Sequence, residues 1–171
     1  VSADRRVVSM EWGSGPDRIH IDQFDGRLSG VFVKRVWSEV TPTAVGGRDG
    51  HVETSDGLLK VDMSIPKSMG GPGRPDTTNP EQLFAMGYAA CFGGAVGFVA
   101  RQQKITPTQI TVTADVHIGK QGEGLGLGVA LTIKVDGVDR ATAEKLVQAA
   151  HQVCPYSKAT RNNIEVKLNV A

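Results

Sequence analysis

The side chains best suited to covalent chemistry are the two cysteines of the chain, Cys91 and Cys154. Both fall on apolar faces of predicted helices, where a thiol is most often an inert core residue. A cytosolic cysteine pair can instead be catalytic or metal-binding. A zinc site would add His151, one helical turn before Cys154, but it lacks a fourth ligand and any Cys-x-x-Cys motif. Residue types and spacing alone leave these alternatives open.

Length and composition indicate one ordinary globular domain. The chain has 171 residues, of which 40% are hydrophobic and 22% are charged. Lysine and arginine number 19 against 18 acidic residues, so the charge balance does not favour nucleic acid or an anionic membrane as a partner. Two cysteines are too few for a disulfide scaffold, and residues 1–20 lack the apolar core of a signal peptide. We therefore expect a cytoplasmic protein.

The segment around Cys91 is unusually apolar. Residues 83–100 carry no charge, and the length of this uncharged segment is at the lower limit for a membrane-spanning helix. Four glycines keep its hydrophobicity low, and small residues recur at a spacing that allows another element to approach closely: Ala89, Gly93 and Gly97. We therefore predict a central core helix rather than a membrane span.

Local signals mark the ends of this helix. Asn79 is a suitable N-cap, Pro80 fits the first helical position, and Gln82 can complete a capping box. The apolar run then predicts a helix that ends near Lys104, before a segment that contains proline.

Three segments alternate apolar and polar residues, which is typical of half-buried strands: 111–118, 125–135 and 164–170. Weaker strand patterns cover residues 31–37 and 57–65.

A second helix is predicted over residues 140–154, with Asp139 as its N-cap and Pro155 ending it. The resulting order is strands, buried helix, strands, helix and strand, which indicates an α+β fold with mostly antiparallel sheet. The apolar stripe of the second helix comprises Ala143, Leu146, Val147, Ala150 and Cys154.

Four motifs occur together in the chain: AVGGRDG, SMGGPG, TNPEQLFAMGYAACF and DRATAEKLVQAAHQVCPYSKATRNNIEV. In these motifs and their spacing, residues 31–171 resemble a single domain of the organic hydroperoxide resistance (Ohr) subfamily of the OsmC/Ohr family. Asn162 replaces a glycine of many relatives, and asparagine tolerates the left-handed turn that glycine would adopt. Residues 1–30 match nothing in the family pattern. With Met10 or a site near Val31 as a candidate for the usual start, they are expected to be a disordered extension or an artefact of start-codon choice.

The resemblance implies an OsmC-like fold in which sheets wrap around long central helices of an intertwined homodimer. It would place the small-residue face of the central helix against the equivalent helix of the partner subunit. We expect no cofactor and no metal ion, and the charge balance and composition predict neither nucleic acid nor membrane as a partner.

The resemblance also implies a thiol peroxidase that acts on alkyl or fatty-acid hydroperoxides. Cys91 would attack the hydroperoxide, release an alcohol and become a sulfenic acid, with which Cys154 would condense to a disulfide. Relatives regenerate the thiols with a dithiol, either dihydrolipoamide or a lipoylated protein. Bulky substrates would suit the apolar side chains near Cys91, namely Phe84, Met86, Tyr88, Phe92 and Phe98.

The family pattern assigns two charged residues to the same site. Arg48 would favour the Cys91 thiolate and bind the peroxide oxygens, and Glu81 would be the partner of Arg48. Without the resemblance, Arg48 would be interpreted as a solvated surface residue, and Glu81 as an acid favoured in the first turn of a helix.

Three other functions stay open from the sequence. One is an OsmC-type peroxidase with a broader range of peroxides. The others are a lipid- or small-molecule-binding module without turnover, and a thiol redox sensor.

Glu81 and Cys91 lie ten positions apart on one predicted helix, or about 15 Å along its axis. Side chains cannot close that gap. Either the helix breaks, for which Gly87 is a candidate, or Glu81 of one subunit lies near Cys91 of the other. We favour the shared site because the apolar run continues beyond Gly87.

The two cysteines are expected to respond differently to substitution. Cys91→Ser should abolish peroxidase activity, because a hydroxyl does not supply the thiolate nucleophile. Cys154→Ser should react once and then accumulate sulfenic or over-oxidised Cys91, detectable by mass spectrometry. Undiminished turnover in both variants would contradict the two-cysteine mechanism.

Overall fold

The computed structural model describes residues 10–12, 19–21 and 41–171. These residues fall into two compact units. The larger unit comprises residues 44–52 and 61–171 and contains every residue assigned to the site above. In the smaller unit, β1 (Met10–Trp12) pairs antiparallel with β2 (Ile19–Ile21). Most of the expected extension over residues 1–30, and the weak strand predicted over 31–37, lie outside the described residues.

The main sheet of the larger unit has the order β6-β7-β8. The strands are β6 (Gln109–Gln121), β7 (Gly124–Asp136) and β8 (Glu165–Val170), which confirms the three strongly alternating segments. β6 and β7 form an antiparallel hairpin, whereas β8 pairs parallel to β7. Parallel pairing of neighbouring strands requires a long crossover, which the second predicted helix supplies here.

The predicted central helix is α1 (Pro80–Gln102), which is continuous through Gly87. The Asn79 side chain caps it by accepting from the Gln82 backbone N–H at 2.9 Å. The Gln82 side chain accepts from the Thr78 hydroxyl at 2.8 Å, so its predicted capping-box bond is replaced by a neighbouring contact. The helix ends two residues before the predicted Lys104.

The crossover consists of α2 (Arg140–Val153) and a short helix that the sequence patterns did not predict, α3 (Pro155–Thr160). Asp139 caps α2 as predicted, because its carboxylate accepts from the Thr142 N–H at 3.0 Å. Pro155 ends α2 and also begins α3, since its fixed φ suits the first position of a helix. Asn162 has a φ of 63°, which confirms the left-handed turn expected there.

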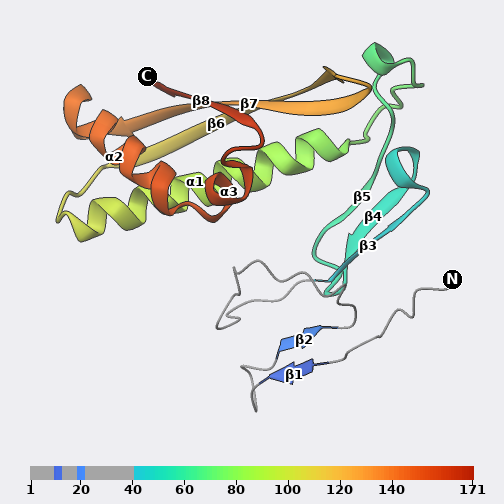
Figure 1. The fold of residues 1–171 in the computed structure, drawn as a ribbon, viewed down its shortest axis with the longest axis horizontal. Helices are drawn as coiled ribbons and strands as arrows, with labels where there is room; N and C mark the ends of the chain where they lie inside the picture. The colour runs from blue at the N-terminus through green and yellow to red at the C-terminus, as the bar shows by residue number, and fades with distance from the viewer. Residues whose placement is uncertain (1–9, 13–18, 22–40) are drawn as a thin grey trace, which may run out of the picture. The chain divides into compact units, whose positions relative to one another are not determined.

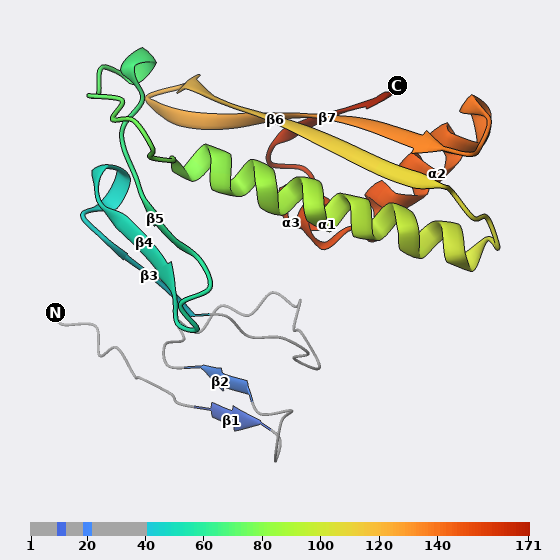
Figure 2. The same ribbon diagram turned by 180° about the vertical axis from the view of Figure 1, so that it is seen from behind.

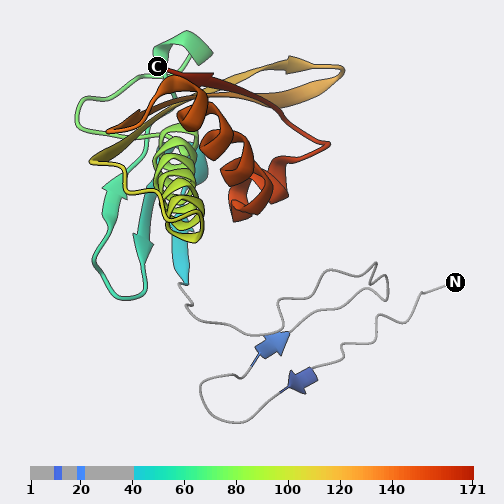
Figure 3. The same ribbon diagram turned by 90° about the vertical axis from the view of Figure 1, so that its left-hand side faces the viewer.

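Both long helices cover the same face of the β6–β8 sheet, as the end-on view shows (Figure 3), and α1 runs along β6 (Figures 1 and 2). The core lies in this layer. The predicted apolar stripe of α2 is fully or almost fully buried, as are Leu131 and Ile133 of β7. Val112 and Ile110 of β6 fill the space beside Gly93 and Gly97. Within the chain, the small residues of α1 therefore accommodate the sheet.

A second sheet has the order β3-β4-β5, with β3 (Pro42–Val45), β4 (His51–Thr54) and β5 (Lys60–Asp62). β5 is shorter than the weak strand pattern over residues 57–65 predicted. The 3-10 turn Gly47–Asp49 connects β3 to β4 and carries Arg48.

Among the described residues, α1 is the one helix long and apolar enough to cross a membrane by length and composition. Its side chains Tyr88, Phe92 and Val96 are buried in the core cluster with α2 and β7. Such burial is typical of the central helix of a globular domain, which agrees with the sequence-based prediction.

Candidate active site

The fold brings the two cysteines together. Cys91 lies in the middle of α1, and Cys154 occupies the corner between α2 and α3. Their sulfur atoms are 3.6 Å apart and not bonded, so both thiols are free. A disulfide has a sulfur–sulfur distance of about 2.05 Å, so a small approach of the two side chains would form one. Cys154 is fully buried, whereas Cys91 is partly exposed.

The surroundings of Cys91 within one chain do not favour its thiolate. Burial raises the pKa of the Cys91 thiol above its ordinary value. The backbone N–H of Tyr156, at the start of α3, donates to the sulfur and opposes this rise, while the neighbouring Cys154 adds to it. A reactive thiolate at this position needs a further positive group.

Among the predicted site residues, Arg48 is the one that carries a positive charge. It forms a bidentate ion pair with Glu81. Its two terminal nitrogens donate to the two carboxylate oxygens at 3.0 and 2.6 Å. The hydrogen bond with Glu81 raises the pKa of Arg48, and the same interaction lowers the pKa of Glu81. Because the pKa of Glu81 is lowered, its carboxylate stays charged at a pH where an ordinary glutamate takes up a proton. The ion pair is therefore lost only as the pH falls through the lowered pKa.

Local backbone geometry presents Arg48 to Glu81. The turn that carries Arg48 is preceded by Gly46, whose φ of 77° is left-handed. It is followed by Gly50, where an added Cβ would lie 1.8 Å from the Val45 carbonyl oxygen, so only glycine fits. Glu81 lies in the first turn of α1, where an acid is also favoured by the helix dipole.

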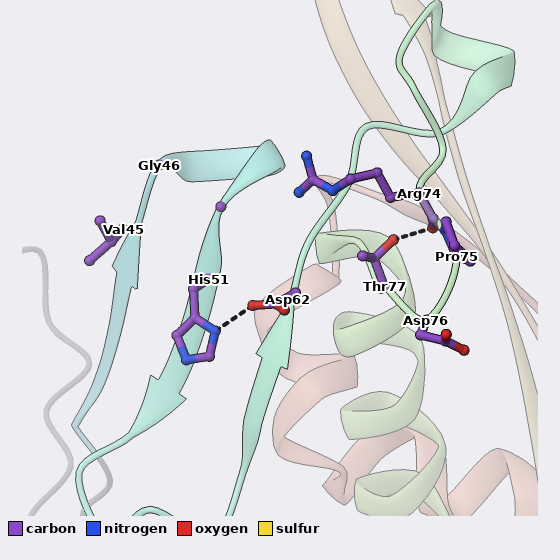
Figure 4. Close-up of a pocket in the computed structure, with 9 residues that line it drawn as sticks. Val45, Gly46, His51, Asp62, Arg74, Pro75, Asp76 and Thr77 are labelled. Carbon is purple, nitrogen blue, oxygen red and sulfur yellow. Dashed lines mark hydrogen bonds and ion pairs between the residues drawn. The ribbon is translucent and has the colours of Figure 1, made fainter.

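Arg74 supports this turn from the loop before α1. It forms an ion pair with Asp49 at 3.2 Å and donates to the Met63 carbonyl at 2.7 Å. It borders a hollow of about 700 Å³ in which His51 and Asp62 lie 2.7 Å apart (Figure 4). None of the four predicted site residues lines this hollow. Arg74 was not among the predicted site residues, because an arginine in a glycine- and proline-rich loop carries no spacing signal.

A second, apolar hollow of about 340 Å³ adjoins the Arg48–Glu81 pair. Of the side chains predicted to surround a substrate, only Phe84 lines it. Tyr88 and Phe92 are fully buried core residues, and Met86 and Phe98 are exposed. The remaining apolar walls were not predicted as site residues: Pro80, Ile118, Leu125 and Leu127.

The structure therefore forms two half-sites within one chain, the Cys91–Cys154 pair and the Arg48–Glu81 pair. No hydrogen bond or ion pair joins the two pairs among the described residues. Because α1 is continuous, Glu81 and Cys91 are separated by about 15 Å along the helix axis. This excludes the alternative in which the helix breaks at Gly87.

His151 is not placed as a metal ligand. Its Nδ1 atom lies 3.0 Å from the Ser157 hydroxyl, and burial, followed by the charge of Arg161, lowers its pKa. In the part of the chain that the structure describes, no three His, Cys, Asp or Glu side chains converge as metal ligands do.

Fold and site together define a class of protein with a pair of free thiols, one on the central helix and one at the corner between two further helices. The OsmC-like protein family matches residues 71–169. The chain therefore belongs to the OsmC/Ohr family, as its motifs predicted.

Similarity to individual proteins narrows this assignment. The chain is 51% identical over 130 residues to the organic hydroperoxide resistance protein of Xanthomonas axonopodis pv. citri, covering 75% of this chain and 91% of that protein. The crystal structure of an organic hydroperoxide resistance protein from Legionella pneumophila matches with a TM-score of 0.76 and 48% identity, over 80% of this chain and 99% of that one. OhrB of Bacillus subtilis matches with a TM-score of 0.73 and 43% identity, over 80% of this chain and all (100%) of that one.

Replacement of Arg48 tests whether its charge acts on the thiol. We expect Arg48→Ala to slow the oxidation of Cys91 by hydroperoxide at least about tenfold, because the partly buried thiolate would lose the cation that the family pattern assigns to it. Arg48→Lys should recover only part of the rate, since lysine cannot bind Glu81 in a bidentate manner. Stopped-flow oxidation is measured beside thermal melting. An unchanged oxidation rate in Arg48→Ala would remove Arg48 from the site.

Proposed function

We propose that the protein is a thiol-dependent peroxidase that reduces organic hydroperoxides to alcohols. The observation that carries this proposal is the pair of free thiols, 3.6 Å apart, one in the middle of α1 and the other at the corner between α2 and α3. The names of the similar proteins, organic hydroperoxide resistance proteins, support the same role. Two thiols at this distance need little movement to form a disulfide, as the second step of the reaction requires.

The reaction proceeds in balanced steps. The Cys91 thiolate attacks the terminal oxygen of ROOH, the O–O bond breaks, and ROH leaves after taking up a proton, which leaves Cys91 as a sulfenic acid. The Cys154 thiol then attacks that sulfur, water departs, and a Cys91–Cys154 disulfide forms. A dithiol reductant exchanges with this disulfide and restores both thiols. Dihydrolipoamide or a lipoylated protein is the proposed reductant.

The hollow beside Arg48 supports a substrate with an extended apolar group. It joins the apolar side chains of Phe84, Ile118 and Leu127 to the Arg48–Glu81 pair. An alkyl or fatty-acid chain would lie against the apolar wall while the hydroperoxide oxygens approach the guanidinium. Hydrogen peroxide has no apolar group to pack against these side chains, so it would be the poorer substrate.

We further propose that the site is completed between two subunits of a homodimer. Within one chain the guanidinium and the thiol belong to separate half-sites on a continuous α1. One apolar face of α1 is left exposed, and its members recur every four residues: Met86, Ala90, Gly94 and Phe98. Exposed apolar faces of this kind are typical of protein interfaces. Covering it with the same helix of a second chain would bring each Arg48–Glu81 pair toward the other chain's Cys91.

Steady-state turnover separates an enzyme from a binding module or a redox sensor. We expect catalytic consumption of cumene hydroperoxide with dihydrolipoamide, and much slower consumption with thioredoxin as reductant or hydrogen peroxide as substrate. The reducing cytoplasm predicted from the sequence would supply such a dithiol. One equivalent of peroxide consumed without turnover, for every dithiol tried, would refute the enzymatic proposal. Equal rates with both peroxides would favour the broader OsmC-type activity.

Mixed dimers test the shared site. Cys91→Ser combined with Glu81→Ala should give heterodimers with one intact site and one doubly damaged site, so activity should recover to about half per dimer. If each site lies within one chain, both sites in the heterodimer stay damaged and no activity recovers. Differently tagged chains allow purification of the heterodimer, and Cys91→Ser mixed with Cys91→Ser/Glu81→Ala is the control without any intact site.

A further inference from the structure

Three polar side chains from three different helices meet in the core beside the two thiols. Tyr88 belongs to α1, His151 to α2 and Ser157 to α3. The Ser157 hydroxyl lies 2.9 Å from the Tyr88 hydroxyl and 3.0 Å from His151 Nδ1. Tyr88 and Ser157 are fully buried. A single hydroxyl on α3 therefore links α1 to α2.

The spacing along the helices relates this link to the cysteines. Tyr88 precedes Cys91 by three residues on α1, and His151 precedes Cys154 by three residues at the end of α2. Residues three apart lie on the same face of a helix, about one turn from each other. Ser157 thus joins the two helices one turn away from the point where the two sulfur atoms face each other.

A buried polar cluster is costly in a core that otherwise consists of apolar side chains. Here the hydroxyl of Tyr88 has a second partner, the Thr160 hydroxyl at 3.3 Å. No buried side-chain nitrogen or oxygen among the described residues lacks a hydrogen-bond partner. A fully satisfied network selects one arrangement of the helices, whereas an apolar replacement could pack in several.

The start of α3 is also held against α1 on its other side. The Tyr156 ring stacks on Phe84 with centroids 6.1 Å apart. An added Cβ at Gly87 would lie 3.0 Å from the Tyr156 hydroxyl, so glycine leaves room for the ring. The same residue supplies the backbone hydrogen bond that lowers the pKa of the Cys91 thiol.

We propose that Ser157 is a positioning residue which, through Tyr88 and His151, fixes the α2–α3 corner so that Cys154 and the Tyr156 N–H both lie against the Cys91 sulfur. The proposal rests on the two-thiol function argued above and adds no chemical step to it. The N–H donor stabilises the Cys91 thiolate during peroxide attack. The fixed corner then keeps the Cys154 sulfur within reach of the sulfenic acid.

Thiol alkylation tests the first consequence without any peroxide. In a Cys154→Ser background, Ser157→Ala should be alkylated by iodoacetamide at Cys91 about fivefold more slowly near neutral pH, the effect of weakening one hydrogen bond. Its pH profile should shift upward, with the parent rate recovered at high pH. Val135→Ala, which truncates a buried side chain of β7 outside both the site and this network, is the control for lost stability and should keep the parent profile.

Disulfide closure tests the second consequence. After one equivalent of cumene hydroperoxide, Ser157→Ala with both cysteines present should form the Cys91–Cys154 disulfide more slowly and give more over-oxidised Cys91. Tyr88→Phe keeps the ring in the core and should shift both readouts in the same direction, which covers the case in which Ser157→Ala does not fold.

Parent-like alkylation profiles and closure rates in Ser157→Ala and Tyr88→Phe would overturn the proposal. So would a shift of equal size in Val135→Ala, because the effect would then reflect general stability. Failure of the peroxidase function itself would appear separately, as absence of turnover in the unmodified protein, while the alkylation profiles would still report on positioning.

Discussion

Continuous backbone hydrogen bonding along α1 fixes the distance between its two reactive regions. The helix has no break between Glu81 and Cys91, so about 15 Å of rigid backbone separates the acid from the thiol. Burial at the middle of the helix raises the pKa of Cys91. The charge that could counter this effect is held at the helix start, in the bidentate pair of Arg48 and Glu81. A second chain is the simplest way to reconcile the needs of the thiol with the rigidity of the helix.

In the Arg48–Glu81 pair, hydrogen bonding outweighs the effect of burial on the carboxyl pKa. The Glu81 side chain is only 11% exposed, yet its pKa is lowered because two hydrogen bonds to a guanidinium outweigh the cost of removing it from water. The carboxylate therefore stays charged and holds the guanidinium in one orientation. An arginine so oriented still has N–H donors left for a second anionic group, such as a thiolate or a peroxide oxygen.

Local signals in the sequence were sufficient for most of the main elements. Asn79, Asp139 and Pro155 act within one turn of the backbone, so a single sequence shows where the helices begin and end. The alternation in β6 and β7 follows from one buried face. α3 was missed because Pro155 is read as a stop signal, although it also starts a helix. The parallel pairing of β8 was missed because alternation does not encode the direction of a partner strand.

The residues of the site were harder to predict from local sequence patterns. The roles of Arg48 and Glu81 came from resemblance to a family, since a single arginine and a first-turn acid have ordinary explanations. No sequence pattern indicated the hydrogen-bonded roles of Ser157 and Tyr88, because their hydroxyl groups acquire partners only after three helices pack together. Arg74 depends in the same way on a loop that returns to the turn after β3.

The position of Cys154 in the β7–β8 crossover couples oxidation to the stability of the fold. The two cysteines are 63 positions apart in the chain, so their sulfurs meet only after the crossover has docked on α1. A bond between them would remove the entropy of a long loop from the unfolded chain, a stabilisation of about 4 kcal/mol in the chain-entropy model. Folding and disulfide formation are thermodynamically linked, so folding in turn favours the disulfide by raising the effective concentration of one thiol at the other. An unfolded or nascent chain would therefore form this disulfide, and give up two electrons, less readily than the native chain.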